Sequence, residues 1–294
     1  MSMEDDISAN KRKSFLLVVL VTFVLVALGY VFAMIYEPGL VFVFMIVAVV
    51  ISTLGSVFTY WNSDTLVLAV TKTREPTPLE RKHLENVVEG LAIAAGIPAP
   101  RIYIIDDEKN LNAFATGRDP EHALIAVTSL LLRTMKRDEL EGVIAHEMSH
   151  IRNYDIRFAT FMAVLVGIIV IASQIFLRSL WFGGGNNNRG KGNAIFIVLG
   201  VVLAILAPIL TQMIQLAASR QREYLADASG ARITRYPEGL AKALERIKNT
   251  NVNTKVNGAV SHMYFSNPML LKNANSLFAT HPPIDERIKR LRAM

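Results

Sequence analysis

Long apolar runs without charge alternate with polar segments along this chain of 294 residues. Residues 14–36 contain no charged side chain, and residues 38–63 form a second such run. Two further uncharged runs cover residues 158–177 and 193–219. An α-helix needs about 20 apolar residues to cross a bilayer. The pattern therefore predicts four transmembrane helices in two hairpins, at about 14–36 and 38–61 and at about 158–177 and 193–216.

The polar segment between the hairpins has the pattern of a mixed α/β domain. Residues 77–80 (T-P-L-E) supply an N-cap, a proline at the first helical position and a capping box, so a helix is predicted from there to Gly96. β-Branched and apolar residues predict strands at 101–106 and 123–128, with a short extended segment at 112–116 between them. Helices are predicted near 129–135 and across the following segment, where Asp138 and Glu141 have the spacing of a capping box.

After the fourth apolar run, the chain is predicted to continue as helix to residue 233 and to form a second helix at 237–248. A polar loop is expected at 249–257, and a basic helix ends near Arg292. The domain division that follows is 1–13 (N-terminal tail), 14–63 (first hairpin), 64–157 and 220–294 (polar parts), and 158–219 (second hairpin, with an outer loop at 183–192).

Composition narrows the class of protein. Hydrophobic residues make up 52% of the chain, which is typical of a membrane protein with a polar portion. The chain has no cysteine, so disulfides and thiolate zinc sites are both excluded. The net charge is +6, and the basic surplus lies after residue 217. We expect this surplus to attract anionic lipid rather than nucleic acid, because no nucleic-acid recognition motif accompanies it.

Lysine and arginine near the span ends predict the orientation. With both termini inside, the inner flanks of the four spans carry 11 such residues and the outer flanks carry 3 (Arg178, Arg189 and Lys191). Cytoplasmic flanks are the ones enriched in Lys and Arg. Both termini and the polar segments are therefore predicted to be cytoplasmic, in a multi-pass membrane protein.

Residues 146–150 (H-E-M-S-H) form an H-E-x-x-H motif within a predicted helix. Positions four apart lie on one helix face, so the imidazoles of His146 and His150 can bind one metal ion. Glu147 lies beside that face and can act on a water molecule without being a ligand. Since catalytic zinc usually has three protein ligands and an open position, a further ligand is required.

The third ligand must come from another part of the chain. Candidates downstream are Glu223, Asp227, Glu238, Glu245, His262, His281 and Glu286. A transmembrane hairpin would hold the helix of His150 beside the helix of Glu223 at a similar height, which favours Glu223. Asp227 follows four residues later on the same helix face and could accept a hydrogen bond from a ligating histidine.

The chain resembles the HtpX-type membrane metalloproteases, which are related to the CAAX prenyl proteases. The motifs that carry this resemblance are H-E-x-x-H, R-E-Y-L-A-D at 222–227, L-N-A-F-A-T-G at 111–117, and T-H-P-P-I-D-E-R at 280–287. The resemblance implies one Zn²⁺ on His146, His150 and Glu223, with Glu147 as general base. It implies a zincin-like (gluzincin) catalytic domain on the cytoplasmic side of transmembrane hairpins.

The same resemblance implies how substrates are bound and what they are. It places Asn112, Ala113 and Phe114 on a substrate-side edge strand, with His281 and Arg287 flanking the site. Alternation along this strand turns Asn112 and Phe114 to one face. The expected activity is cleavage of misfolded or damaged membrane proteins under stress.

Other classes of protein remain as alternatives. A CAAX-type processing protease would need a large intramembrane chamber, for which four spans are few. In an intramembrane-cleaving protease the motif lies within a span, but here Arg137, Asp138 and Arg152 surround it. A transporter usually places ionisable groups inside its spans, and a scaffold with a structural metal would close the site with a fourth ligand.

Overall fold

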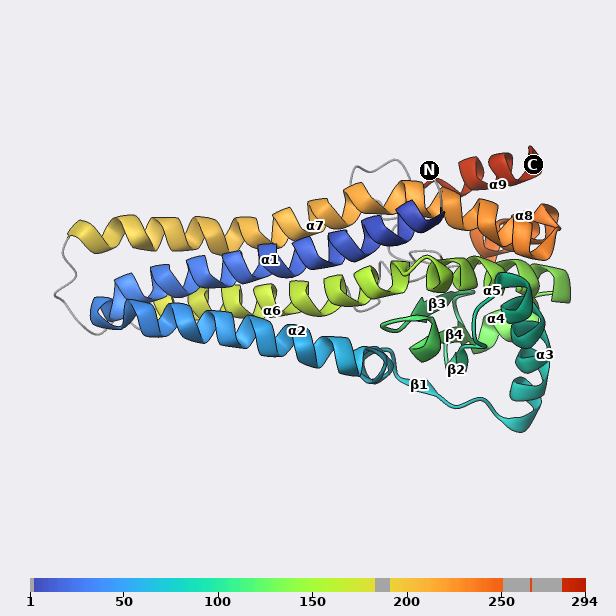
Figure 1. Ribbon diagram of the computed structural model, residues 1–294, viewed down its shortest axis with the longest axis horizontal. Helices are drawn as coiled ribbons and strands as arrows, with labels where there is room; N and C mark the ends of the chain where they lie inside the picture. Colours follow the sequence, from blue (N-terminus) through green and yellow to red (C-terminus); the bar gives the residue numbers. More distant parts are fainter. Residues whose placement is uncertain (1–2, 183–190, 251–264, 266–281) are drawn as a thin grey trace. The chain divides into compact units, whose positions relative to one another are not determined.

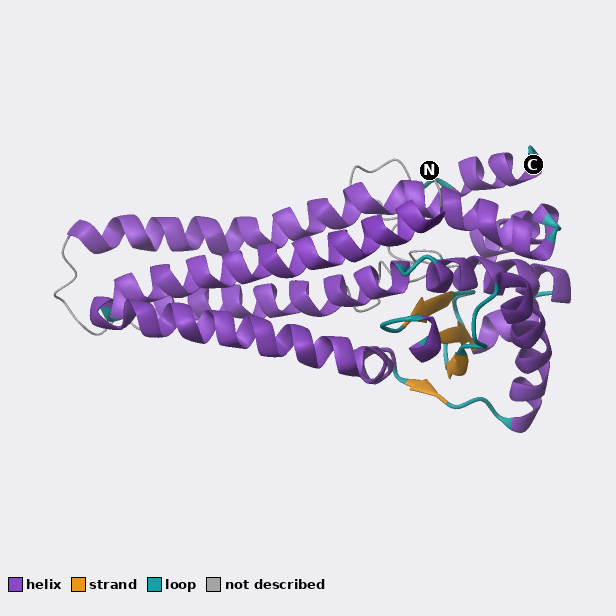
Figure 2. Ribbon diagram, viewed as in Figure 1, coloured by secondary structure: helices purple, strands orange, loops and turns teal. Residues whose placement is uncertain are grey.

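The computed structural model describes residues 3–182, 191–250, 265 and 282–294 (Figure 1). The chain divides into two compact units. The sheet unit comprises Met1–Lys11, Asn62–Thr160 and Leu216–Met294, and the bundle unit comprises Arg12–Trp61 and Phe161–Gln215. Figure 2 shows that the strands belong to the sheet unit and that helices make up the described part of the bundle unit.

The bundle unit is formed by parts of four long helices. These are α1 (Met3–Tyr36), α2 (Val41–Thr71), α6 (Asp155–Phe182) and α7 (Lys191–Thr234). The turn predicted after the first run is the 3₁₀ helix Pro38–Leu40. Thr22 and Ser52 share a hydrogen bond of 2.6 Å between α1 and α2, which satisfies hydroxyl groups in an apolar bundle. One cluster of buried apolar side chains among the described residues of this unit comprises Val31, Ile35, Phe176 and Ala204.

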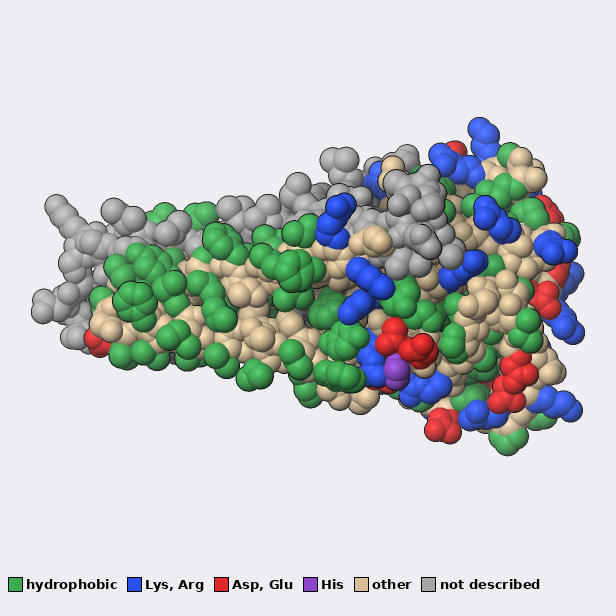
Figure 3. All heavy atoms as spheres, in the orientation of Figure 1, with side chains coloured by type: hydrophobic (Ala, Val, Ile, Leu, Met, Phe, Trp, Pro, Cys, Tyr) green, Lys and Arg blue, Asp and Glu red, His purple; other side chains and the backbone are tan. Residues whose placement is uncertain are grey.

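Two described helical segments, Ser14–Tyr36 and Pro38–Asn62, are long and apolar enough to cross a membrane. Their outer surface is apolar as well, which suits contact with lipid rather than water. Figure 3 shows hydrophobic side chains over this part of the molecule and charged ones over the sheet unit. The most exposed large apolar residues on these segments include Phe15, Phe23, Phe42, Ile46, Leu54 and Trp61.

The second predicted hairpin is described only in part. Both of its segments are helical, in α6 and α7. Among the described side chains of α6, Ile168–Arg178 forms an apolar stretch. Residues 183–190 of the predicted outer loop and most side chains of the fourth run lie outside the described residues.

In the sheet unit, helix α3 (Pro78–Ala95) begins and ends where the sequence predicted. The Thr77 backbone N–H donates to the Glu80 carboxylate at 2.8 Å, and the Thr77 hydroxyl accepts from the Glu80 N–H at 3.4 Å. Gly96 follows the helix with φ 69°, a left-handed conformation that favours glycine. Both ends of the helix are therefore determined by local sequence.

The sheet unit also contains a four-stranded mixed sheet, in the strand order β1-β2-β4-β3. Strands β2 (Arg101–Ile105) and β4 (Leu124–Thr128) are parallel, with Tyr103 opposite Ala126. Strand β3 (Ala113–Thr116) runs antiparallel to β4 and forms one edge of the sheet. At the other edge is β1 (Thr73–Arg74), a short strand that the sequence did not predict. Each of the two longer predicted strands, and the extended segment between them, is confirmed.

Helix α5 (Arg137–Arg152) carries the H-E-x-x-H motif and packs on α3, β3 and α8 (Pro237–Thr250). The predicted cap at Asp138 is wrong, because Lys136 is the N-cap. The Lys136 N–H donates to the Glu139 carboxylate at 2.9 Å, and Arg246 from α8 holds that same carboxylate. A tertiary ion pair thus selects Glu139 over Glu141 as the capping carboxylate.

The remaining helices close the core of the sheet unit. Helix α4 (Ser129–Thr134) follows β4, and α9 (Ile284–Arg292) packs on α8. Helix α8 extends two residues beyond its predicted end, and the rest of the loop expected there lies outside the described residues. The core comprises buried residues from α3, the sheet, α5, α8 and α9, among them Leu84, Ile104, Ile125, Leu140, Ile144, Leu244 and Leu291.

Gly142 lies where α5 and α8 approach closely. A Cβ atom at Gly142 would lie 2.7 Å from the Leu240 backbone nitrogen, so the two helices could not both stay in place. We expect Gly142→Ala to destabilise the protein by about 1–3 kcal/mol, as overpacking does. Gly90→Ala is the control, because nothing lies within 4 Å of a Cβ there and loss of a mid-helix glycine stabilises by about 0.5–1 kcal/mol.

The measurement for this pair is thermal unfolding of the two variants in detergent. Opposite signs of the change in Tm are expected. A Gly142→Ala variant as stable as wild type would show that α5 and α8 do not cross so closely.

Candidate metal centre

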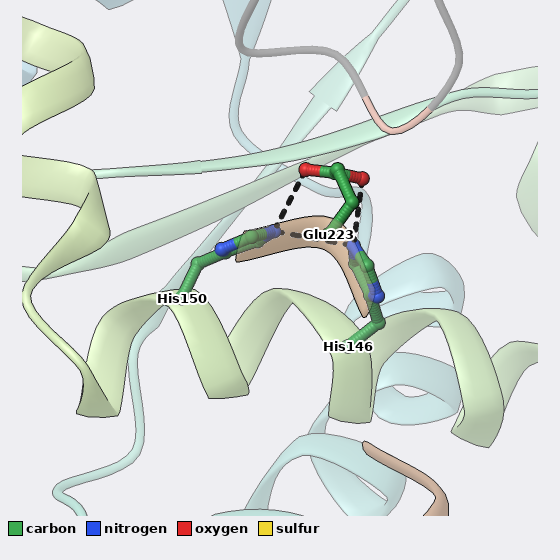
Figure 4. A group of neighbouring side chains, drawn as sticks. All are labelled: His146, His150 and Glu223. Atoms are coloured by element: carbon green, nitrogen blue, oxygen red, sulfur yellow. Dashed lines mark hydrogen bonds and ion pairs between the residues drawn. The ribbon is translucent and has the colours of Figure 1, made fainter. Parts of the chain in front are cut away.

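Helix α5 presents two imidazoles on one face, one turn apart (Figure 4). The Nε2 atoms of His146 and His150 lie 3.2 Å apart, and the ring planes are nearly perpendicular. His146 is fully buried, with 1% of its surface exposed, whereas His150 is partly exposed. The two nitrogens therefore converge on one point at the boundary of the core.

Glu223 completes the group from α7. Its carboxylate oxygens lie 3.6 Å from His146 Nε2 and 3.5 Å from His150 Nε2. The three side chains form a group whose ligand atoms all lie within 4.8 Å of one another. Gly230 lets α7 approach α5 here, because a Cβ atom at Gly230 would be 3.0 Å from the His146 backbone nitrogen.

The opposite nitrogen of each ring is held by a carboxylate. His146 Nδ1 lies 3.0 Å from Asp227 Oδ1, and His150 Nδ1 lies 2.9 Å from Asp155 Oδ2. A carboxylate accepts, so each Nδ1 carries a proton and donates it. In the neutral ring each Nε2 then has a lone pair, and these lone pairs face each other and the Glu223 carboxylate. Only a cation makes such an arrangement favourable.

The spacing of the three groups fits a tetrahedral metal ion. An ion about 2.0–2.1 Å from each ligand, at tetrahedral angles, requires ligand atoms about 3.3 Å apart. The distances of 3.2, 3.5 and 3.6 Å in this chain are close to that value. Two imidazoles and one carboxylate could therefore hold a metal and leave a fourth position open.

Charges around the group hold it in place. Arg287 is buried and donates to both oxygens of Asp227, at 2.8 and 2.7 Å, and its Nη1 lies 3.4 Å from Glu223 Oε2. Burial opposes ionisation of Asp227, but the Arg287 charge outweighs it and lowers the pKa of Asp227 to about 2. Burial lowers the pKa of His146 to about 4, which keeps that ring neutral at pH 7.

His150 has the opposite electrostatic environment. Burial alone would lower its pKa, but the Asp155 and Glu223 carboxylates raise the pKa of His150 well above its usual value. Two carboxylates thus favour positive charge at this nitrogen cluster, whether a proton or a metal ion carries it.

Glu147 connects the metal group to the sheet. It is buried, and burial raises the pKa of its carboxyl to about 7. The Ala115 backbone N–H hydrogen-bonds this carboxylate, so Glu147 lies against the edge strand β3. A carboxylate of this pKa can both take up and release a proton near neutral pH.

The other residues predicted for the site fall in different places. Asn112 is buried, and its side-chain oxygen accepts from the Ala113 N–H at 3.0 Å. Phe114 is fully buried in the sheet, and Ala113 is a residue of β3. Arg287 lies beneath the metal group, against Asp227. His281 lies outside the described residues.

Two residues of the site were missed from the sequence. Asp155 lies five positions after His150, past the end of α5, where a carboxylate near a ligating histidine could have been noticed. Phe265 packs on His146 with ring centroids 4.8 Å apart, and no local pattern distinguishes it.

Removing either carboxylate behind the histidines should weaken metal binding. Asp227→Ala and Asp155→Ala are each expected to lower zinc affinity about 10- to 100-fold, as loss of an outer-shell partner typically does. Competition with a zinc chelator measures this. Asp285→Ala is the control, because that carboxylate is exposed and pairs with Lys248 away from the site. Wild-type affinity in Asp227→Ala would contradict its proposed role.

A family model and several known proteins match most of this chain. The family model described as peptidase family M48 matches residues 78–294. A "Protease HtpX homolog" of Dictyoglomus turgidum is 46% identical over 289 residues, covering 98% of this chain and 93% of the relative. One from Streptococcus uberis is 42% identical over 301 residues, with 98% of each chain covered.

Among solved structures, the crystal structure of S. mikatae Ste24p matches 96% of this chain and 65% of its own, at 19% identity and a TM-score of 0.48. This chain therefore spans just under two thirds of that protein.

Proposed function

Because the chain belongs to peptidase family M48 and is a membrane metalloprotease, we propose that it is a zinc-dependent endopeptidase with its site at His146, His150 and Glu223. The observation that carries this proposal is the convergence of two imidazole nitrogens and one carboxylate beside Glu147. The proposed substrates are misfolded or damaged proteins of the bacterial plasma membrane, cleaved on its cytoplasmic side.

His146, His150 and Glu223 would hold the zinc ion. When bound, zinc would supply a Lewis acid that lowers the pKa of a water molecule and polarises the peptide carbonyl. Glu147 takes the proton of the attacking water and delivers it to the leaving amine. Asp155 and Asp227 orient the two imidazoles, and Arg287 keeps Asp227 ionised.

Strand β3 is the proposed binding edge for the substrate. It is an edge strand next to Glu147, and an extended peptide can add to such an edge through main-chain hydrogen bonds. Binding of this kind depends little on the sequence of the substrate, which suits an enzyme that degrades many different damaged proteins. A processing enzyme for one defined motif would need more specific pockets.

Casein digestion by the detergent-solubilised chain tests the proposal. We expect one zinc per chain, hydrolysis that stops when a chelator removes the metal, and recovery when zinc is added back. Failure to digest casein with full zinc occupancy would favour a scaffold with a structural metal.

We further propose that both termini and residues 64–157 are cytoplasmic and that residues 183–192 are outside. The exposed apolar surfaces of Ser14–Tyr36 and Pro38–Asn62 support a first membrane hairpin, and the basic flanks of the runs support the orientation. The same basic flanks would contact anionic lipid.

Cysteine labelling tests this topology, since the chain has no cysteine of its own. In intact cells, Asn187→Cys should react with a membrane-impermeant thiol reagent, whereas Asn253→Cys should react only after lysis. Equal protection of both in intact cells would mean that the third and fourth apolar runs do not span the membrane.

A further inference from the structure

Phe265 makes main-chain contacts with the substrate side of the site. Its backbone N–H donates to the Ala113 carbonyl of β3 at 2.8 Å. Its own carbonyl accepts from Arg287 Nη1 at 3.4 Å. Phe265 is thus bound through both of its backbone groups, one on an edge strand and one on the arginine behind the metal group.

The edge of β3 that points away from β4 is identified by its register. Asn112 faces β4, because its carbonyl accepts from the Thr128 N–H at 2.9 Å, and Phe114 is paired with Ala126. Backbone groups alternate sides along a strand, so those of Ala113 and Ala115 point away from β4. Ala113 meets Phe265 there and Ala115 meets Glu147. Phe265 and the general base therefore occupy neighbouring positions on one edge.

The Phe265 ring lies against the metal group. Its centroid is 4.8 Å from that of the His146 ring, edge to face, and 4.8 Å from the Arg287 guanidinium carbon. Only 1% of the residue is exposed. The space beside His146 is therefore filled by a large apolar side chain.

Core packing alone would explain the buried ring but not the choice of backbone partners. Any buried residue needs partners for its backbone N–H and C=O, but those of Phe265 are an edge strand beside Glu147 and the arginine behind the metal group. Phe265 thus combines a hydrogen bond to an edge strand, a hydrogen bond from a buried arginine, and a side chain directed at a ligand residue. The main-chain bond to the strand edge and the enclosed side chain are the contacts expected of one residue of an extended peptide bound beside a catalytic centre.

We propose that Phe265 occupies the place of a substrate residue, so that the enzyme selects peptides with a large apolar side chain there and binds them by displacing Phe265. This inference rests on the proposed peptidase function. It adds the class of substrate, and it makes Phe265 an internal competitor of that substrate. Since damaged membrane proteins expose large apolar side chains, they would compete best for this place.

Removing the internal competitor should strengthen binding of the matching substrate. Two fluorogenic peptides are compared, identical except for one central Phe or Asp. Wild type should prefer the Phe peptide, and Phe265→Ala should lower KM for that peptide by about threefold or more, since a larger fraction of the enzyme is open. The change in kcat should be small by comparison. Phe265→Leu, which keeps an apolar side chain, should fall between the two.

Phe114→Ala is the matched control, because Phe114 is an equally buried phenylalanine of β3 on the side that pairs with β4. We expect it to lower Tm without lowering KM. If Phe265→Ala and Phe265→Leu both fail to fold, or lose activity only in proportion to lost folded protein, Phe265 is a structural wall and the inference is overturned.

Displacement itself can be observed without catalysis. In the full-length Glu147→Ala enzyme loaded with zinc, Phe265→Cys supplies a single thiol, since the natural chain has none. Its maleimide reactivity should be low and should rise about tenfold when the Phe peptide saturates the enzyme, because labelling follows the open population. Phe114→Cys should stay protected throughout.

Peptide binding is measured in parallel by fluorescence anisotropy. Binding without any rise in the thiol reactivity of Phe265→Cys would overturn the inference while leaving the peptidase function intact. If wild type cleaves neither peptide nor casein with zinc bound, the proposed function fails first and this inference with it.

Discussion

Glu147→Ala is expected to remove nearly all peptide hydrolysis while leaving zinc near one per chain. A positioned general base typically contributes about 10²–10⁴-fold to the rate, and Glu147 is a buried carboxylate next to His146 on α5 that hydrogen-bonds the edge of β3. The converging ligand atoms belong to His146, His150 and Glu223, so the loss of Glu147 should not open the metal site. Casein digestion and metal analysis on the same purified sample measure both quantities.

Glu141→Ala is the matched control for this prediction. Glu141 is a carboxylate of the same helix, but it pairs with Arg137 at 2.8 Å at the helix surface. Its loss should change neither zinc content nor activity. If Glu147→Ala lost the metal itself, Glu147 would be a ligand and the assignment of the base would be wrong.

Elements governed by local chemistry could be predicted from the sequence. Helix α3 is an example, because Thr77, Pro78 and Gly96 determine its ends through contacts within a few residues. The strands β2 and β4 followed from runs of apolar and β-branched residues. What local sequence did not contain was β1, a two-residue strand whose pairing with β2 depends on the fold. The cap of α5 was misassigned for the same reason, since Arg246 reaches Glu139 from a distant helix.

The candidate site shows the same division. The pair His146 and His150 followed from helical spacing alone, because residues four apart share a face. Glu223 was favoured among seven candidates by the hairpin argument, and the structure brings it to the same point. Arg287 could not be placed beneath Asp227 from the sequence, since 60 residues separate them. The role of Phe265 could not be predicted because its contacts, to β3, His146 and Arg287, are all long-range.

Glu223→Ala is expected to lower zinc affinity by more than the roughly 10- to 100-fold typical of an outer-shell loss, because it removes one of three proposed ligands. Activity should fall with metal content and return only in part at high zinc concentration. The fold should persist, since Arg287 keeps its two hydrogen bonds to Asp227 and is not left as an unpaired buried charge. Zinc titration and circular dichroism on one sample separate these effects.

Glu245→Ala provides the comparison, because Glu245 was also a candidate ligand by sequence. The structure pairs it with Arg292 at 2.8 Å on the surface, together with Glu238. Its removal should leave zinc affinity unchanged, since neither carboxylate faces the imidazoles. His281→Ala is measured as well. If Glu223→Ala bound zinc normally and His281→Ala lost it, His281 would replace Glu223 in the ligand set. The argument that a helix hairpin brings the third ligand to α5 would then be wrong.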